Sequence, residues 1–139
     1  MALEDLYNPG CFACGTDNNC GLKLSIEAEK GKALTVFILD EKYEGWKGIA
    51  HGGIIATILD EVMAWAVISL GHVAVTAALE IRYRSPMFIG KSYRAIAKVK
   101  EGKDRKFIVE AFIEGIQGDK IAEAKGVYVR VPEEKLSPR

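Results

Sequence analysis

Two adjacent carboxylates, Asp60 and Glu61, lie near the middle of a long apolar run. The run covers residues 54–70 and follows the glycine pair Gly52-Gly53. Acidic side chains are seldom buried without a partner or a function. A carboxylate can activate water as a general base, and the free N–H groups at the start of a helix can stabilise negative charge. These residue types therefore fit a hydrolytic attack on a carbonyl carbon.

The spacing of these groups predicts how the protein assembles. Eight helical residues separate Gly52 from Asp60, which corresponds to a rise of ~12 Å. One carbonyl group cannot contact both residues on the same helix, so a working site needs Gly52 from one subunit and Asp60 from another. We therefore predict a homodimer, in which antiparallel helices across a two-fold axis form two equivalent sites. A dimer of dimers is a further expectation.

Each of these residues also has a structural interpretation. Gly52 and Gly53 suit a tight junction between a loop and a helix as well as an oxyanion site. From the residues alone, the role of base is open between Asp60 and Glu61, and a structural ion pair is a third alternative. His51 precedes the helix and could cap it, orient the loop or contact a substrate.

Basic side chains that could bind an anionic substrate follow the apolar run. Arginine forks and lysine charges favour phosphate groups. The candidates are Arg82, Arg84, Lys91, Lys103, Arg105 and Lys106. Each is more often an ordinary charge on a surface strand.

The three cysteines, Cys11, Cys14 and Cys20, all lie near the N-terminus. The Cys-x-x-Cys spacing of the first two is typical of zinc or redox sites, but a structural zinc site uses four ligands. Both histidines are distant in the sequence, and there is no second Cys-x-x-Cys pair. We therefore expect no metal, and small, partly buried thiols in an N-terminal flap.

The composition is that of an ordinary globular chain of 139 residues, with 49% hydrophobic and 27% charged residues. Nineteen basic and nineteen acidic residues cancel, so the charge favours neither nucleic acid nor an anionic membrane as partner. The first residues lack a signal peptide, and two acids at the centre of the apolar run argue against a membrane span. We expect a cytoplasmic protein with a single domain over residues 1–139.

Period-two alternation and turn signals predict six strands around the helix. Two strands precede the helix, over residues 22–29 and 33–40, and four follow it, over residues 73–84, 93–100, 106–114 and 120–131. Residues 1–21 form the irregular flap, and residues 132–139 form a frayed tail.

Two strands carry further expectations. In the first strand after the helix, alternation places Thr76 on the same face as Glu80 and Arg82 and opposite Leu79 and Ile81. In the last strand, a row of small residues, Ala122, Ala124 and Gly126, suits close packing on the helix. Hairpin-length turns imply an antiparallel sheet. The predicted class is therefore α+β, with one long helix wrapped by a curved antiparallel sheet of five to six strands.

The motif His51-Gly52-Gly53-x6-Asp60 resembles that of the hotdog-fold acyl-CoA thioesterases, and most of all their PaaI-like branch. Further matching pieces extend over most of the chain. They are Cys11-Phe12-x-Cys14-Gly15, Gly21-Leu22, Thr76 and Tyr83-x-x-Pro86. With an acid at this spacing on an apolar helix, the motif is fairly specific for the superfamily and much less so for the substrate.

The resemblance implies roles for individual residues. Asp60 would be the catalytic carboxylate, as general base or as nucleophile, and Glu61 a supporting residue near the substrate. The backbone N–H of Gly52, beside Gly53, would point at the thioester carbonyl oxygen, and Thr76 would help to place the attacking water. Many relatives carry Asn or Gln six residues before the histidine, where this chain has Gly45, so a backbone group or water would have to replace that side chain.

The resemblance implies an acyl-CoA thioesterase that acts on an acyl- or aryl-CoA and needs no metal or organic cofactor. Two alternatives stay open. The first is a hotdog hydratase or dehydratase, which pairs a histidine with an acid across the dimer, so that His51 would have to serve. The second is a non-catalytic acyl-CoA sensor or interaction module on the same fold.

Overall fold

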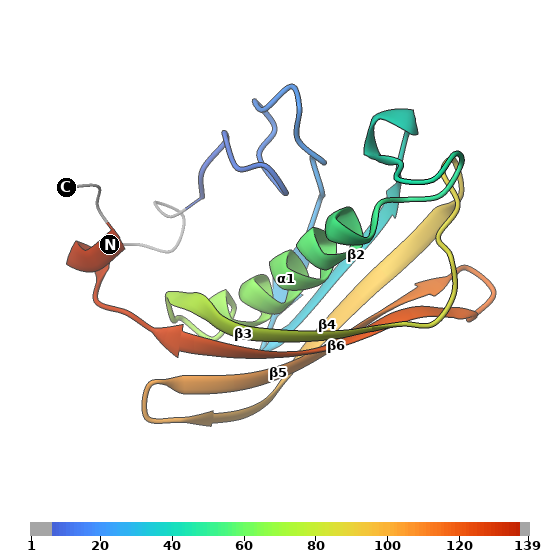
Figure 1. The fold of residues 1–139 in the computed structure, drawn as a ribbon. Coiled ribbons are helices and arrows are strands. Elements are labelled where there is room, and N and C mark those ends of the chain that lie inside the picture. The colour runs from blue at the N-terminus through green and yellow to red at the C-terminus, as the bar shows by residue number, and fades with distance from the viewer. Residues whose placement is uncertain (1–6, 137–139) are drawn as a thin grey trace.

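The computed structural model describes residues 7–136 of the chain. One helix, α1, lies in the hollow of a six-stranded antiparallel sheet whose strand order is β1-β2-β4-β5-β6-β3 (Figure 1). The strands are β1 (Glu27–Glu29), β2 (Lys32–Ile38), β3 (Ala74–Tyr83), β4 (Ser92–Lys103), β5 (Lys106–Gly115) and β6 (Lys120–Arg130), and α1 spans Gly52–Ile68. The predicted α+β class and the order of its elements are confirmed.

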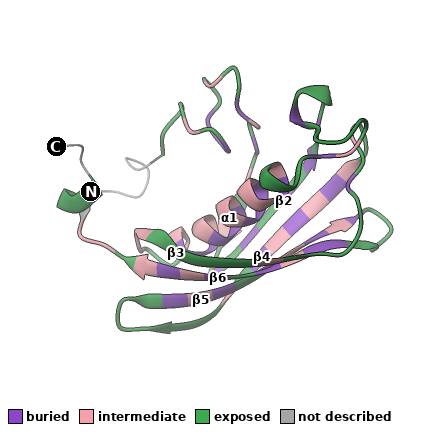
Figure 2. Ribbon diagram, viewed as in Figure 1, coloured by how far each residue is buried: buried purple, intermediate pink, exposed green. Residues whose placement is uncertain are grey.

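The helix packs on the sheet through one continuous apolar face. Seven residues of this face are buried, at the three- and four-residue spacing of an amphipathic helix. They are Ile55, Ile58, Leu59, Val62, Met63, Ala66 and Val67. Figure 2 shows buried positions alternating along the central strands, as expected for a sheet with one covered face.

The small residues of β6 allow the helix to approach closely. Ala122 is fully buried, and a methyl group at Gly126 would lie 3.2 Å from the sulfur of Met63 in α1. The expectation that this row packs on the helix is confirmed.

Strand β3 forms one edge of the sheet and pairs only with β6 in the part of the chain that the structure describes. Its register shifts between Thr76 and Ala78, which marks a β-bulge. After a bulge the alternation of side chains reverses with respect to the sheet. Thr76 therefore faces the helix, as Ile81 and Tyr83 do, and its predicted place on the face of Arg82 was wrong.

The predicted first strand is also too long. Only Glu27–Glu29 pairs with β2. Lys23 has a positive φ of 52°, and the Leu24 N–H donates to the Ala13 carbonyl in the N-terminal segment, 2.9 Å away. Leu24 is buried, as the alternation of apolar and polar residues predicts. Its backbone, however, bonds the N-terminal segment and not the sheet.

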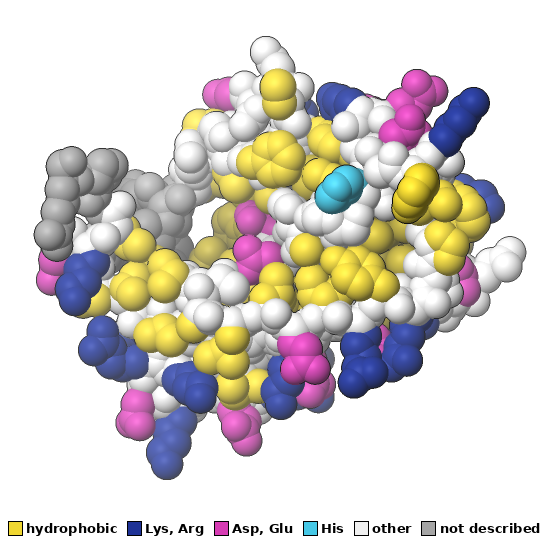
Figure 3. All heavy atoms as spheres, in the orientation of Figure 1, with side chains coloured by type: hydrophobic (Ala, Val, Ile, Leu, Met, Phe, Trp, Pro, Cys, Tyr) yellow, Lys and Arg dark blue, Asp and Glu magenta, His cyan; other side chains and the backbone are white. Residues whose placement is uncertain are grey.

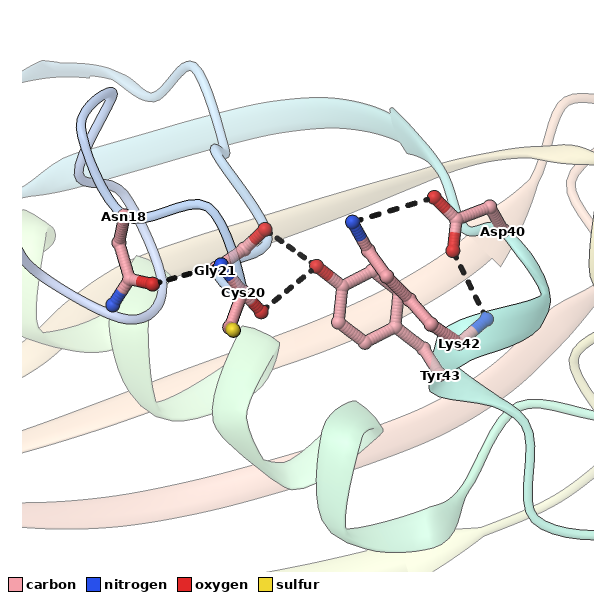
Figure 4. A network of polar contacts seen from close by, with 6 residues as sticks. All are labelled: Asn18, Cys20, Gly21, Asp40, Lys42 and Tyr43. Carbon is pink, nitrogen blue, oxygen red and sulfur yellow. Dashed lines mark hydrogen bonds and ion pairs between the residues drawn. The ribbon is translucent and has the colours of Figure 1, made fainter.

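The segment over residues 7–21, which we call the N-terminal segment, contains no helix or strand and runs beside α1 (Figure 1). Tyr43 fixes its end, because its hydroxyl donates to the carbonyl oxygens of Cys20 and Gly21 (Figure 4). Tyr43 follows Asp40, which caps a short 3-10 helix over Glu41–Tyr43. The segment is thus anchored on the domain.

At the other end of the chain, Glu133–Leu136 form a short 3-10 helix where a frayed tail was predicted. The rest of that tail, and residues 1–6 of the predicted flap, lie outside the described residues. Within residues 7–136, α1 is too short to be a candidate for crossing a membrane. The expected cytoplasmic location stays a prediction.

Candidate active site

Asp60 lies in the middle of α1 and is half-buried. Its Oδ1 atom accepts two hydrogen bonds of 2.7 Å, one from the Thr76 hydroxyl of β3 and one from the Tyr128 hydroxyl of β6. Among the described residues, no side chain donates to Oδ2. The sheet therefore fixes one carboxylate oxygen and leaves the other available to a water or a substrate.

The β-bulge explains how Thr76 reaches Asp60. Without the extra residue, Thr76 would share the outer face of the sheet with Glu80 and Arg82. Bulges are common beside active sites, where they redirect a single side chain. Sequence periodicity predicts a regular strand and cannot place such an insertion.

Tyr128 is a site residue that the sequence analysis did not identify. Its side chain is fully buried, and its hydroxyl also lies 3.1 Å from the Asp60 carbonyl oxygen. Burial, and then the negative charge of Asp60, raise the pKa of Tyr128, so it stays a hydrogen-bond donor. A signal was present: Tyr128 continues the period-two row of Ala122, Ala124 and Gly126, which faces the helix.

The N-terminus of α1 is built differently from its middle. His51 is the N-cap, and its Nδ1 atom accepts the Gly53 N–H at 2.9 Å. A side chain at Gly53 would lie 3.1 Å from that nitrogen, so glycine makes room for the cap. His51 therefore caps the helix, which is one of the roles considered for it. A role in the chemistry stays a prediction.

Gly52 is the first residue of the helix and is exposed. Its carbonyl accepts a 2.7 Å hydrogen bond from the Tyr83 hydroxyl, and no described residue accepts its N–H. A methyl group here would meet the Tyr83 ring at an ordinary distance of 3.7 Å. The protomer itself therefore does not require glycine at this position, and the bare N–H is open to a ligand or a partner.

The space beside Gly45 is occupied by His51. A methyl group at Gly45 would lie 3.2 Å from the Cα of His51 and 3.4 Å from its ring. In this backbone an Asn or Gln side chain has little room at position 45. Gly45, Trp46, Ala50, His51 and Gly52 line a pocket of about 380 Å³ at the helix N-terminus.

Glu61 has other partners than the two hydroxyls that hold Asp60. The Trp65 indole N–H donates to its Oε1 atom at 3.0 Å, and the Cys11 thiol lies 3.9 Å from the same oxygen. Cys14 is buried, and burial, together with the nearby Glu61, raises the pKa of its thiol. Glu61 thus belongs to a second group of residues, between α1 and the N-terminal segment.

Three of the six predicted phosphate-binding cations lie on the other side of the sheet. Arg82 lines a groove on the outer face, and Arg84 pairs with Glu123 at 3.1 Å. Lys106 precedes the buried Phe107, so its side chain also points away from the helix. The structure does not bring these three residues together with Asp60 within one protomer.

The helix side of the molecule carries apolar surface around a hollow. In Figure 3 apolar side chains surround a hollow in which acidic side chains are visible. Trp46 adds a large apolar side chain that is 83% exposed beside the pocket at the helix N-terminus.

Comparison with known proteins identifies relatives of this architecture. Acyl-coenzyme A thioesterase THEM4 of Mus musculus is 32% identical over 93 residues, which cover 66% of this chain and 40% of that protein. The chain spans about half the length of the curated relatives it matches.

Two solved structures share the fold. The E. coli PaaI protein from the phenylacetic acid degradation operon superposes with a TM-score of 0.76 at 24% identity, over 80% of this chain and 81% of that one. A hypothetical thioesterase from Streptococcus pneumoniae, solved with coenzyme A, has a TM-score of 0.75 at 19% identity, over 78% and 85% of the two chains. The latter was also solved as two variants, with an aspartate or a threonine changed to alanine.

The family model of the thioesterase superfamily matches residues 47–122, which include α1, β3, β4 and β5. This match covers more than half of the chain, and the fold of the solved relatives agrees with it. The chain adopts the hotdog fold and belongs to the thioesterase superfamily.

Proposed function

We propose that this protein hydrolyses acyl-CoA thioesters, with Asp60 as the catalytic carboxylate and Thr76 and Tyr128 as the residues that position it. The observation that carries the proposal is the state of the Asp60 carboxylate. Two hydroxyls from the sheet fix Oδ1, and Oδ2 stays free. A carboxylate held in this way is oriented for chemistry at its second oxygen.

The reaction follows from these groups. Asp60 Oδ2 accepts a proton from a water molecule, whose oxygen attacks the thioester carbonyl carbon. Negative charge develops on the carbonyl oxygen and is stabilised by the Gly52 N–H, next to the positive end of the helix dipole. The C–S bond then breaks, and the coenzyme A thiolate takes up a proton, so that free acid and coenzyme A leave. The Thr76 oxygen retains lone pairs with which it can orient the water.

In an alternative route Asp60 Oδ2 attacks the carbonyl carbon itself and expels the thiolate. Water then opens the resulting mixed anhydride. After one turnover in H₂¹⁸O with excess enzyme, ¹⁸O in the Asp60 carboxylate would identify an anhydride that water opens at the Asp60 carbonyl carbon. Water that attacks the acyl carbon leaves its oxygen in the free acid in either route. Mass spectrometry of the peptide that contains Asp60 would detect ¹⁸O in the carboxylate.

We further propose that each site combines Asp60 of one subunit with Gly52 of another. Both residues lie on α1, eight positions apart, a rise of ~12 Å. The exposed Gly52 N–H then donates a hydrogen bond to a substrate held at the partner's Asp60.

The free edge of β3 supports this assembly. It is ten residues long, and long exposed edges tend to pair with another chain. Three apolar side chains of β3, Val75, Leu79 and Tyr83, are 42%, 37% and 52% exposed and leave apolar surface for a partner to cover. Pairing of β3 with a second copy would cover this edge and bring the two helices side by side.

The relatives support the choice of substrate and residues. The S. pneumoniae protein binds coenzyme A in one structure. The aspartate and threonine changed in its two variants are sixteen positions apart, as Asp60 and Thr76 are here. A role for Arg82, Arg84 and Lys106 in binding coenzyme A phosphates stays a prediction. These residues would bind the phosphates on the outer face of the sheet, or those of the partner subunit would bind them.

The experiment that tests this function is thiol release from a panel of short, medium, long and aryl acyl-CoAs. Wild type should release thiol from at least one member, and Asp60→Asn should not, although it binds the same compound. Thr57→Ser, a change on the same helix that keeps the hydroxyl, is the matched control. If wild type binds acyl-CoAs but releases no thiol, the thioesterase proposal is overturned and an acyl-CoA sensor is favoured.

A further inference from the structure

Three metal-ligating side chains that the proposed reaction does not use meet between α1 and the N-terminal segment. The sulfur atoms of Cys11 and Cys14 and a carboxylate oxygen of Glu61 all lie within 4.8 Å of one another. The Cys11 Sγ atom lies 3.9 Å from the Glu61 Oε1 atom. Cys14 is buried, and the other two residues are half-buried.

The backbone of the N-terminal segment fixes the two cysteines side by side. The Gly15 N–H donates to the Cys11 carbonyl at 2.9 Å and closes a tight turn around the Cys-x-x-Cys pair. A methyl group at Gly15 would lie 2.3 Å from the Pro9 carbonyl oxygen and 2.5 Å from the Cys11 nitrogen. Only glycine fits this turn, and the turn presents both thiols to the helix.

The third member of the group is also held in place. The Trp65 indole N–H donates to Glu61 Oε1 at 3.0 Å, from one helical turn further along α1. Hydrogen bonds of this kind orient the ligands of metal sites.

We propose that Cys11, Cys14 and Glu61 bind a Zn²⁺ ion. Zinc bonds of about 2.3 Å to sulfur and 2.0–2.2 Å to oxygen imply neighbouring ligand atoms roughly 3.5–3.8 Å apart in a tetrahedron. The three ligand atoms, within 4.8 Å of one another, lie close to that arrangement. Two thiolates favour zinc over magnesium or calcium, and a water molecule can supply the fourth ligand through the partly exposed side of the group.

The residues near the Cys-x-x-Cys pair predict no metal site, because they do not supply enough further ligands. Glu61 is fifty positions away from Cys11, and only the fold brings it to them. The ion would tie the N-terminal segment to the helix at the residue next to Asp60. This proposal does not depend on the proposed thioesterase activity.

The test uses the full chain, purified under reducing conditions without chelator. Mass spectrometry for elements should find about one zinc per chain. After removal of zinc, titration with Co²⁺ should produce the intense near-ultraviolet absorption of a thiolate–cobalt bond, and zinc should displace it.

Two variants and a matched control locate the site. Cys14→Ser and Glu61→Gln should weaken Co²⁺ binding by more than about tenfold. Cys20→Ser should bind as wild type does, because Cys20 is exposed and outside the group. Circular dichroism checks that each variant is folded.

A second measurement keeps the test independent of variants. In wild type, zinc should protect two of the three cysteines from alkylation, and a chelator should expose them. The proposal is overturned if folded wild type shows no thiolate–cobalt absorption, or if zinc protects no thiol. It is also overturned if Cys20→Ser loses the cobalt signal as fully as Cys14→Ser does.

Discussion

The middle and the N-terminus of α1 carry the two groups that the proposed reaction needs, and they differ in how complete they are. At the middle, Asp60 has two hydroxyl partners from two strands of its own protomer. At the N-terminus, Gly52 is exposed, and its N–H has no acceptor among the described residues. One protomer therefore builds the carboxylate half of the site and leaves the oxyanion half open, as a site shared between subunits requires.

The largest effect on activity should come from a change at Asp60, in the carboxylate half of the site. Asp60→Asn keeps the size of the side chain and removes its ability to accept a proton, so acyl-CoA hydrolysis should fall by roughly 10²–10⁴-fold. The measurement is kcat for thiol release, with binding of the same acyl-CoA by calorimetry as the control. A variant that keeps wild-type kcat would show that Asp60 is not the catalytic carboxylate.

The next largest effect on activity should come from a change at Gly52, in the oxyanion half of the site. Gly52→Pro removes the N–H and adds the pyrrolidine ring, which is accepted at the first position of a helix. The preceding His51 already has extended angles, with φ −63° and ψ 135°, which suit a residue before proline. We expect kcat to fall by about 10²–10³-fold.

Gly52→Ala is the matched control for that change, because it retains the N–H and fits at 3.7 Å from the Tyr83 ring. It should keep most of the activity. Equal losses in the proline and alanine variants would point to crowding and not to a missing donor.

A smaller effect is expected from the two hydroxyls that hold Asp60. Tyr128→Phe and Thr76→Val each remove one hydrogen bond to a charged oxygen, worth about 1.5–3 kcal/mol. We expect kcat to fall by about tenfold or more in each, with little change in binding. If the two changes together cost no more than one alone, the hydroxyls act as a unit, which a double-mutant cycle would measure.

The smallest effect concerns stability at high pH. Burial and the charge of Asp60 raise the pKa of Tyr128 above its ordinary value of 10.0. The folded protein then keeps a proton that the unfolded chain releases, so the stability from this group is present below pH 10 and is lost as the pH rises further. Tyr128→Phe should flatten the fall in the free energy of unfolding between pH 9 and about 11. An unchanged slope would show that Tyr128 does not carry this effect.

The sequence was sufficient for the parts of the fold that follow local periodicity. The apolar run predicted α1, and the small residues of β6 predicted where the sheet meets it. Asp60 and Thr76 were both identified as candidates, and the structure brings their side chains to 2.7 Å.

The rest depended on contacts that periodicity does not record. The bulge in β3 turns Thr76 to the helix, and a regular alternation predicts the opposite face. Tyr128 becomes a site residue only because β6 lies beside β3, 68 positions after Asp60 in the chain. In the same way, the meeting of Glu61 with Cys11 depends on how the N-terminal segment folds back on α1.

The central claim, that Asp60 and Gly52 act from different subunits, is tested most directly by mixing two inactive variants. Asp60→Asn and Gly52→Pro chains are co-expressed with different tags, and the mixed dimer is purified and assayed for thiol release. In that dimer one site carries both changes and the other carries neither, so the account predicts about half of the wild-type activity per dimer. A mixed dimer as inactive as its two parents would contradict the shared site and place both groups within one subunit.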